Sequence, residues 1–319
     1  MAGSILLLDT FHESFIPMLR EMKFSCTEAY DWSREEVENQ VKDFDGLAIR
    51  SRMPVDKSLL QKAAKLKFIA RGGAGMENID VAFAEQQGIA CLNAPEANRD
   101  AVGEHALMML LALMNQLLKA DAEVRSGIWL REENRGNELH GKTVGIIGFG
   151  NMGSAFAEKI SAMGVSLLAY DKYISIDNEK FPYVRQVSLE ELQKQADVIS
   201  LHVPLTEETR YFIDDKLISS CQKNIYIINT ARGKCLNTAH LVKHLKSGKV
   251  SGACLDVHEY ETSSFEKLDS MPEPFEYLIH SAKVILTPHI AGWTHESNRK
   301  IAEVLAKKNC FTNDINLHA

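Results

Sequence analysis

Residues 143–171 constrain the fold more than any other stretch, because they predict a strand, a tight turn, a helix and a second strand in succession. The turn carries the spacing G-x-G-x-x-G as Gly148-Phe149-Gly150-Asn151-Met152-Gly153. The first glycine allows a sharp turn, the second lets backbone approach a pyrophosphate, and the third lets the helix pack on the strand. The helix then presents unpaired N–H groups and the positive end of its dipole to an anion. The stretch therefore predicts a nucleotide-binding Rossmann unit.

The second strand of this unit ends at Asp171, 18 residues after Gly153. A carboxylate at that place can accept hydrogen bonds from the ribose of adenosine, and it would repel the 2′-phosphate of NADP. Asp171 therefore favours NAD, although Lys172 could partly neutralise a phosphate. A methyltransferase can share the same unit, and a glycine-rich structural turn can share the spacing, so the motif alone leaves the chemistry open.

The rest of the chain predicts two α/β domains, because 319 residues exceed what one hydrophobic core usually holds. Apolar runs alternate with helix-period segments such as 33–41, which is typical of parallel α/β domains. The expected strands cover residues 5–8, 46–50, 67–71, 89–93, 143–147, 165–170, 197–202, 225–230, 251–256 and 284–287.

The expected helices cover residues 98–120, 237–248 and 297–311. Asn98 or Asp100 can cap the first of them, and Gly248 can end the second. Residues 261–281 contain two prolines and mixed charge, and they predict a surface loop with one helical turn near 275–279.

Composition argues against nucleic-acid and membrane partners. The net charge of -7 lacks the basic excess that phosphate binding needs, and the apolar helix expected at 106–113 is too short to span a bilayer. The N-terminus has a brief apolar run without a basic region, which predicts a strand rather than a signal peptide. The six cysteines show no C-x-x-C pair and predict buried free thiols. We therefore expect a cytoplasmic protein without a metal site.

The chain resembles the D-isomer-specific 2-hydroxyacid dehydrogenase family through motifs that cover nearly its whole length. These are R-G-G-A-G-M-E-N-I-D (71–80), N-A-P-E-A-N (93–98), the glycine motif, H-V-P-L-T (202–206), N-T-A-R-G (229–233), L-D-V-x-E-x-E (255–261) and T-P-H-I-A-G (287–292). In this order they are far more specific than any one alone, so the methyltransferase alternative falls away. The resemblance implies two parallel-sheet α/β domains: a Rossmann NAD-binding domain (99–292) inserted into a smaller flavodoxin-like substrate domain (1–98 and 293–319).

The resemblance also implies three catalytic residues. Arg232 matches the substrate-orienting arginine, His289 the acid–base histidine, and Glu261 the acid beside it. Oxidation of a 2-hydroxy acid needs a base for the hydroxyl proton while hydride goes to nicotinamide, and imidazole can act as base or acid near neutral pH. Glu261 would orient and stabilise the protonated imidazole, and Arg232 offers two parallel donors to a carboxylate. In contrast, we expect His105 and His244 to be hydrogen-bonded core residues.

The implied NAD-binding residues follow the ends of the expected strands. Asp256 is assigned to the nicotinamide amide, with a purely structural turn as the open alternative. The full set is Gly148, Gly150, Asn151, Met152, Gly153, Asp171, His202, Val203, Pro204, Thr209, Thr230, Ala231, Arg232, Asp256, His289 and Gly292.

The implied substrate residues lie mainly in the first domain. The glycine-rich turn at 71–75 can form an anion-binding nest of backbone N–H groups, and in the family it holds the substrate carboxylate. Three arginines match positions where the phosphoglycerate dehydrogenase branch binds the substrate phosphate, and Y-D-K-Y-I-S (170–175) also resembles that branch. The expected substrate residues are Arg50, Ser51, Arg71, Gly73, Ala74, Gly75 and Arg131.

The leading hypothesis is an NAD-dependent D-3-phosphoglycerate dehydrogenase, with glycerate, hydroxypyruvate or another small 2-hydroxy acid as the alternative substrate. A formate dehydrogenase is disfavoured, because it carries an amide where this chain has Glu261. An NAD-sensing scaffold like the related corepressors is the alternative from another class. Thr262 stands where proline is usual, Asn237 replaces an expected acid, and the 261–281 loop is long, which leaves substrate scope open.

Two further expectations concern assembly and length. The apolar helix at 106–113 is followed by the polar stretch 126–142, which contains Trp129 and Leu130 and therefore predicts an arm that packs on a partner. A homodimer is expected, as the resemblance also implies. Within 319 residues we expect no C-terminal regulatory domain of the kind that some phosphoglycerate dehydrogenases carry.

Overall fold

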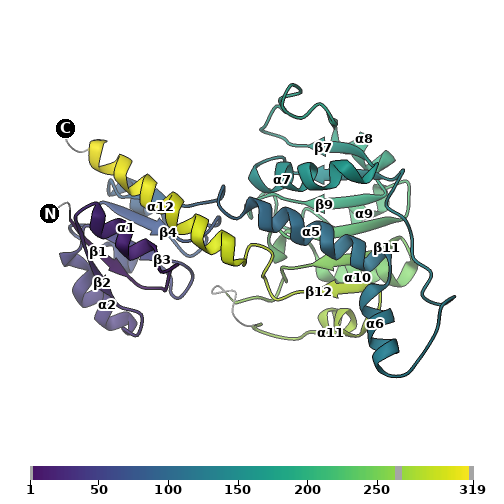
Figure 1. Cartoon of the computed structure of the whole chain (residues 1–319), viewed down its shortest axis with the longest axis horizontal. Helices are drawn as coiled ribbons and strands as arrows, with labels where there is room; N and C mark the ends of the chain where they lie inside the picture. The colour runs from purple at the N-terminus through teal and green to yellow at the C-terminus, as the bar shows by residue number, and fades with distance from the viewer. Residues whose placement is uncertain (1–2, 263–267, 316–319) are drawn as a thin grey trace. The chain divides into compact units, whose positions relative to one another are not determined.

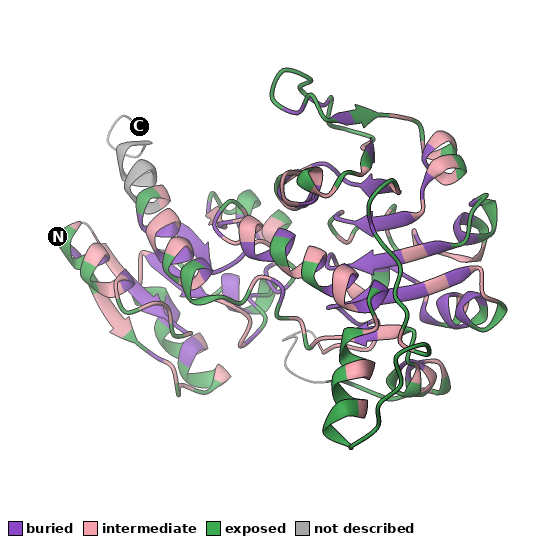
Figure 2. Cartoon of the chain, turned by 45° about the vertical axis from the view of Figure 1, so that its right-hand side comes forward, coloured by how far each residue is buried: buried purple, intermediate pink, exposed green. Residues whose placement is uncertain are grey.

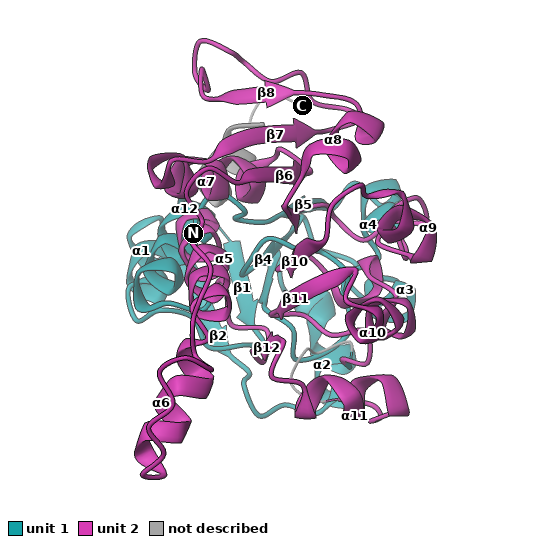
Figure 3. Ribbon diagram, turned by 90° about the vertical axis from the view of Figure 1, so that its right-hand side faces the viewer, with its two compact units in different colours: residues 1–98, 262–267, 293–319 teal, residues 99–261, 268–292 magenta. Residues whose placement is uncertain are grey.

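A computed structural model describes residues 3–262 and 268–315 of the chain, and their side chains as far as residue 308. The chain divides into two compact units (Figure 3). The first contains residues 1–98 and 293–319, grouped with 262–267, and the second contains residues 99–261 and 268–292. Part of the expected 261–281 loop, residues 263–267, lies outside the described residues.

The first unit is built on a five-stranded sheet in the order β2-β1-β3-β4-β5, which is the flavodoxin-like order (Figure 1). Every neighbouring pair in it is parallel. Its elements are β1 (Gly3–Leu7), α1 (Phe15–Glu21), β2 (Phe24–Glu28), α2 (Arg34–Gln40), a 3₁₀ turn (Val41–Asp43), β3 (Gly46–Ile49), α3 (Lys57–Leu60), β4 (Phe68–Arg71), α4 (Val81–Gln86), β5 (Ala90–Leu92) and α12 (His295–Ile315).

The second unit is built on a seven-stranded parallel sheet in the order β12-β11-β10-β9-β6-β7-β8. The chain changes its direction of winding between β6 and β9, as in a Rossmann sheet. Its elements are α5 (Arg99–Met114), α6 (Leu117–Arg125), β6 (Thr143–Ile147), α7 (Asn151–Ile160), a 3₁₀ turn (Ser161–Met163), β7 (Ser166–Tyr170), β8 (Val184–Gln186), α8 (Leu189–Gln195), β9 (Val198–Leu201), α9 (Asp215–Ser220), β10 (Ile225–Asn229), a 3₁₀ turn (Gly233–Cys235), α10 (Thr238–Ser247), β11 (Val250–Leu255), α11 (Glu273–His280) and β12 (Val284–Leu286). The two sheets confirm the predicted α/β class.

Helices cover both faces of each sheet, and central strands such as β3, β4 and β9 are fully buried (Figure 2). In the second unit, one apolar cluster lies under α8 to α11 and another lies under α5 and α7. In the first unit, α2 to α4 cover one face of the sheet, and α1 with α12 covers the other. Burial on both faces explains why the central strands are continuous apolar runs that could be recognised in the sequence.

Local signals set several of the helix ends. Asn237 accepts a hydrogen bond from His240 N at 3.0 Å and caps α10, and Gly248 ends that helix with a left-handed φ of 80°. Ser33 and Glu36 form a reciprocal capping box at the start of α2. The expected helix at 237–248 is confirmed.

The single helix expected at 98–120 is wrong, because the chain forms α5 and α6 instead. Gln116 adopts a left-handed φ of 53°, which an α-helix cannot continue. The Asn98 side-chain oxygen is buried without a hydrogen-bond partner, so it does not cap α5. No single described helix is long and apolar enough to cross a membrane, and α5 and α6 pass that test only as a pair bent by 62°.

Other differences from the sequence analysis are smaller. The strands β2 and β8 were not expected, because both are short, partly polar and at the edge of a sheet. Helix α11 has 8 residues where one helical turn was expected, and α12 extends beyond both ends of 297–311. Cys26 and Cys91 are half-buried rather than buried, and Cys310 lies outside the described side chains.

Candidate active site

The glycine loop after β6 is closed on its inner side and open on its outer side. A Cβ on Gly148, where φ is 88°, would lie 2.6 Å from the His202 carbonyl oxygen, so only glycine fits there. A Cβ on Gly153 would lie 2.0 Å from the Gly148 carbonyl oxygen. Around Gly150, in contrast, nothing lies within 4 Å of the Cβ position. This open side, at the N-terminus of α7, leaves room for a ligand phosphate.

Asp171 ties the end of β7 to the glycine loop. Its Oδ2 accepts a hydrogen bond from Phe149 N at 2.7 Å, and its Oδ1 accepts from Tyr173 N and Ile174 N at 2.9 Å. A carboxylate has about four acceptor sites, so capacity for a ribose hydroxyl remains. Lys172 forms an ion pair with Glu208, which draws its ammonium towards that carboxylate.

The segment after β9 contains an uncharged histidine, His202, and a loop that is fixed by hydrogen bonds. Burial lowers the pKa of His202 to about 3, so the imidazole is neutral at physiological pH, and its Nε2 lies 2.7 Å from Ser200 Oγ. The Thr209 hydroxyl donates to the Pro204 carbonyl oxygen at 2.6 Å and accepts from Thr206 N at 2.8 Å. These bonds fix the backbone at Val203 and Pro204.

The turn after β10 carries Arg232 and is held from within by Asn229. The Asn229 amide accepts from Ala231 N and donates to the Arg232 carbonyl oxygen, both at 3.0 Å. Gly233 is required there, because its Cβ would lie 1.9 Å from the His258 carbonyl oxygen. The Arg232 guanidinium donates to the Ala231 carbonyl oxygen at 2.6 Å, which holds it beside the strand end.

His289 and Glu261 form a hydrogen-bonded pair. The distance from His289 Nδ1 to Glu261 Oε2 is 2.8 Å, and the two side chains are 23% and 10% exposed. The other Glu261 oxygen accepts from His258 N, so the carboxylate is held on both sides. His289 has a φ of 56°, an uncommon conformation for a non-glycine residue and one that is often found at functional sites. Of the two ring nitrogens, Nδ1 is the one that this carboxylate engages.

Asp256 holds the loop that carries His289. Its carboxylate is 1% exposed and accepts hydrogen bonds from Thr287 Oγ1 at 2.6 Å, Ile290 N at 2.8 Å and Ala291 N at 2.9 Å. These bonds give Asp256 a structural role in the loop, and its expected contact with a nicotinamide amide stays a prediction.

His105, which was expected to be a hydrogen-bonded core residue, makes its hydrogen bond within this network. Its Nε2 lies 3.1 Å from Thr287 Oγ1 and 3.5 Å from Asp256 Oδ1. No motif pointed to it, because α5 and β12 are far apart in the sequence. His244 is buried and lies 2.7 Å from Asp215 Oδ1, as a hydrogen-bonded core residue should.

In the first unit, two expected substrate arginines lie at the ends of neighbouring strands: Arg50 follows β3, and Arg71 is the last residue of β4, where it pairs with Ile49. Gly73 has a φ of 151°, a backbone conformation that residues with a side chain rarely adopt, so glycine is favoured beside the Arg71 guanidinium. The Asn93 amide donates to the Ala74 carbonyl oxygen at 2.7 Å and fixes the turn before Gly75.

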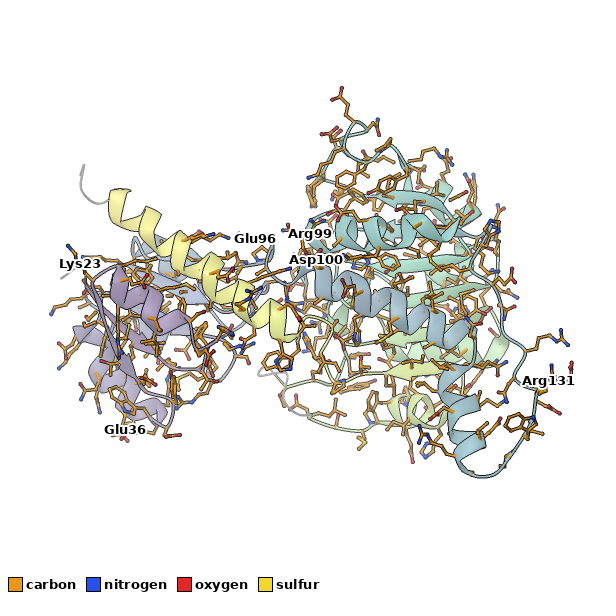
Figure 4. The ribbon with its side chains drawn as sticks, viewed as in Figure 1. Lys23, Glu36, Glu96, Arg99, Asp100 and Arg131 are labelled. Carbon is orange, nitrogen blue, oxygen red and sulfur yellow. The ribbon has the colours of Figure 1, made fainter. Side chains whose placement is uncertain are left out.

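The other two expected substrate residues, Ser51 and Arg131, lie outside the turn at 71–75 and stay predictions. Ser51 lines a cavity of about 280 Å³ whose lining includes no residue of the 71–75 turn. Arg131 is exposed at the outer end of the arm, beyond α6 (Figure 4). The structure therefore does not bring Arg131 together with Arg232. Among the described residues, no cluster of His, Cys, Asp and Glu could hold a metal ion.

Comparison with known proteins decides the family. The model for the NAD-binding domain of D-isomer-specific 2-hydroxyacid dehydrogenases matches residues 107–291. The glyoxylate reductase of Thermococcus litoralis is 38% identical over 275 residues, which cover 84% of this chain and 80% of that protein. The chain belongs to this family.

Other members differ in length and in the substrate that they are named for. The D-3-phosphoglycerate dehydrogenase of Archaeoglobus fulgidus is 34% identical over 303 residues, which cover 95% of this chain and 56% of that protein. The chain thus spans about half the length of such relatives. The D-lactate dehydrogenase of Aquifex aeolicus, solved with NAD and lactic acid, superposes with a TM-score of 0.83 at 30% identity, covering 98% of this chain and 96% of that one.

The second unit fits NAD, the cofactor of the family's matched domain. The open space at Gly150 can take the pyrophosphate, and Asp171 can take the ribose. Two buried polar atoms, His202 Nδ1 and Thr230 Oγ1, have no hydrogen-bond partner among the described residues, as expected where a polar ligand completes the site.

Proposed function

We propose that the chain is an NAD-dependent D-2-hydroxyacid dehydrogenase. The hydrogen-bonded pair of His289 and Glu261 carries the proposal, because an imidazole held by a carboxylate can take up or release one proton at a fixed position. Arg232, Glu261 and His289 follow β10, β11 and β12, which are neighbours in one parallel sheet. Ligands of such sheets bind beyond the carboxyl ends of the strands.

The residues divide the reaction between them. Bound NAD supplies the hydride acceptor at its nicotinamide ring. His289 Nε2 takes the hydroxyl proton during oxidation and returns it during reduction. Glu261 orients the ring through Nδ1 and stabilises its protonated form. The Arg232 guanidinium offers two donors to the carboxylate and the C2 oxygen of the substrate.

D-3-phosphoglycerate is the proposed substrate, with glycerate and other small 2-hydroxy acids as alternatives. Arg50 and Arg71 support an additional anionic group, because both lie at the carboxyl ends of the neighbouring strands β3 and β4 and Arg71 is buried. The relatives named for phosphoglycerate and for glyoxylate have similar sequence identity to this chain, 34% and 38%. Sequence identity therefore does not distinguish between these substrates.

A substrate panel tests this proposal. We expect reduction of 2-keto acids with NADH, oxidation of the matching D-2-hydroxy acids with NAD, and at least tenfold lower efficiency with NADP, because Asp171 repels its 2′-phosphate. Absorbance of the reduced cofactor measures each reaction. Turnover of no 2-hydroxy or 2-keto acid would favour the NAD-sensing scaffold instead.

We also propose that the protein is a homodimer that uses α6 and the arm at 126–142. Figure 2 shows most of this region in the colour of exposed residues. Its exposed apolar side chains include Leu117, Leu118, Val124 and Trp129, the last 77% exposed. An exposed apolar surface of this kind is typical of an interface. A cytoplasmic location is proposed with it, because the described cysteines carry thiols rather than disulfides.

A further inference from the structure

Trp293 lies over Arg50 in the first unit. The centre of the guanidinium is 4.1 Å from the centroid of the indole ring, although the tryptophan is 66% exposed. A large aromatic side chain in such an exposed place has little packing reason to be there. The stacking contact is the interaction that this ring makes with a charged neighbour, and it covers one face of the guanidinium.

The protein also holds Arg50 through hydrogen bonds to its backbone and to one guanidinium nitrogen. Its backbone N donates to Asp9 Oδ2 at 2.6 Å, and its Nη1 lies 3.4 Å from Asn298 Oδ1. Its Nε is buried and has no hydrogen-bond partner among the described residues. Burial lowers the pKa of Arg50, which is opposed by the charge of Asp9. The guanidinium is therefore partly desolvated, and nothing in the described part of the chain accepts from its Nε–H.

The backbone under Trp293 is also fixed. Thr294 N donates to Ser297 Oγ, and Ser297 N donates to Thr294 Oγ1, both at 3.0 Å. This reciprocal pair closes the first turn of α12 directly after Trp293. The indole therefore projects from a rigid helix start, four residues after His289 in the sequence.

We propose that Trp293 is a specificity-determining residue that selects 2-hydroxy acids carrying a second anionic group. Its ring holds the Arg50 guanidinium in one plane, so that the edge of that plane, with its N–H groups, faces the distal anion of the substrate. An arginine fixed in this way loses less conformational freedom when it binds a phosphate. This assignment rests on the proposed function, because it requires Arg50 to bind substrate.

Two substitutions separate the aromatic contact from simple packing. Trp293→Phe keeps an aromatic face for Arg50, whereas Trp293→Leu keeps an apolar side chain without one. The assay compares kcat/KM for 3-phosphohydroxypyruvate, which has a distal phosphate, with kcat/KM for glyoxylate, which has none. The ratio of the two is the selectivity.

Trp293→Leu should lower the selectivity about three- to tenfold, mainly through a higher KM for the phosphorylated acid, while glyoxylate reduction stays within about twofold. Trp293→Phe should keep the selectivity within about twofold. An unchanged ratio in Trp293→Leu, an equal loss for both acids, or a wild-type protein that prefers glyoxylate overturns the assignment. A wild-type protein that reduced neither acid would instead overturn the proposed function on which it rests.

Discussion

At the scale of single residues, the site depends on side chains that the chain itself holds in place. Both oxygens of Glu261 are engaged, one by His289 and one by the backbone of His258. Asp256 holds the following loop through three hydrogen bonds. A carboxylate fixed in this way can orient an imidazole without reorganising during the reaction.

Glu261→Gln should shift the pH dependence of keto-acid reduction. The amide still reaches His289 but no longer stabilises its protonated form, and reduction needs that form. The pH above which reduction falls off should therefore move to lower values, which a pH profile of kcat/KM measures. Glu259→Gln is a matched control, because Glu259 lies two residues away and contacts Tyr211 and Thr238 N instead. Superimposable profiles for Glu261→Gln and wild type would contradict the role of Glu261.

His202 should make the fold less stable in acid. Its folded pKa is about 3, whereas the unfolded residue titrates near the ordinary value of 6.5. Below pH 6.5 the unfolded state binds a proton that the folded state does not bind. The free energy of unfolding therefore has its full value above pH 6.5 and decreases as the pH falls towards 3. The decrease is at most about 1.4 kcal/mol per pH unit. Urea unfolding at pH 7 and pH 5 should show a smaller loss in His202→Asn than in wild type. Equal losses would contradict the burial argument.

At the scale of elements, the sequence predicted what local rules control and missed what tertiary contacts control. The buried strands β6, β9 and β10 were predicted because strands covered on both faces are apolar throughout. The break after α5 was missed because Gln116, unlike glycine or proline, gives no warning of a left-handed φ. The strands β2 and β8 were missed because edge strands can be polar.

The same distinction applies to the candidate site. The motifs predicted that His289 and Glu261 would meet, which the structure shows at 2.8 Å. They could not show that the Asp256 carboxylate accepts hydrogen bonds from the loop after β12, or that His105 reaches Thr287. These contacts join elements that are distant in the sequence. Nor could they place Arg131, whose position depends on the course of the arm after α6 (Figure 4).

The start of α12 offers a prediction for one helix cap. Thr294→Val removes the hydroxyl that accepts from Ser297 N, so the folded state should lose about 1 kcal/mol. Thr294→Ser keeps the hydroxyl and should stay close to wild type. Urea unfolding of the three proteins measures the difference. If the valine and serine variants were equally stable, the cap would contribute nothing and Trp293 would lack the rigid base described above.

At the scale of the whole molecule, the arm should determine assembly. We expect a dimer mass in light scattering at micromolar concentration, because α6 and the arm expose an apolar surface that a second copy can cover. The double variant Leu118→Glu, Trp129→Glu places charges on that surface and should be monomeric. Tyr183→Glu alters an exposed aromatic residue between β7 and β8 and should remain a dimer. A monomeric wild type would contradict the proposed interface.

Proton transfer by His289 is the central claim, and His289→Gln tests it most directly. The substitution removes the acid–base group but leaves the glycine loop and Asp171 unchanged. Turnover should fall by about a hundredfold to ten-thousandfold, while the Kd for NADH, measured by fluorescence titration, stays within about threefold. Near-normal turnover would show that another residue carries the proton. Loss of NADH binding together with turnover would show that His289 is needed for the structure rather than for the chemistry.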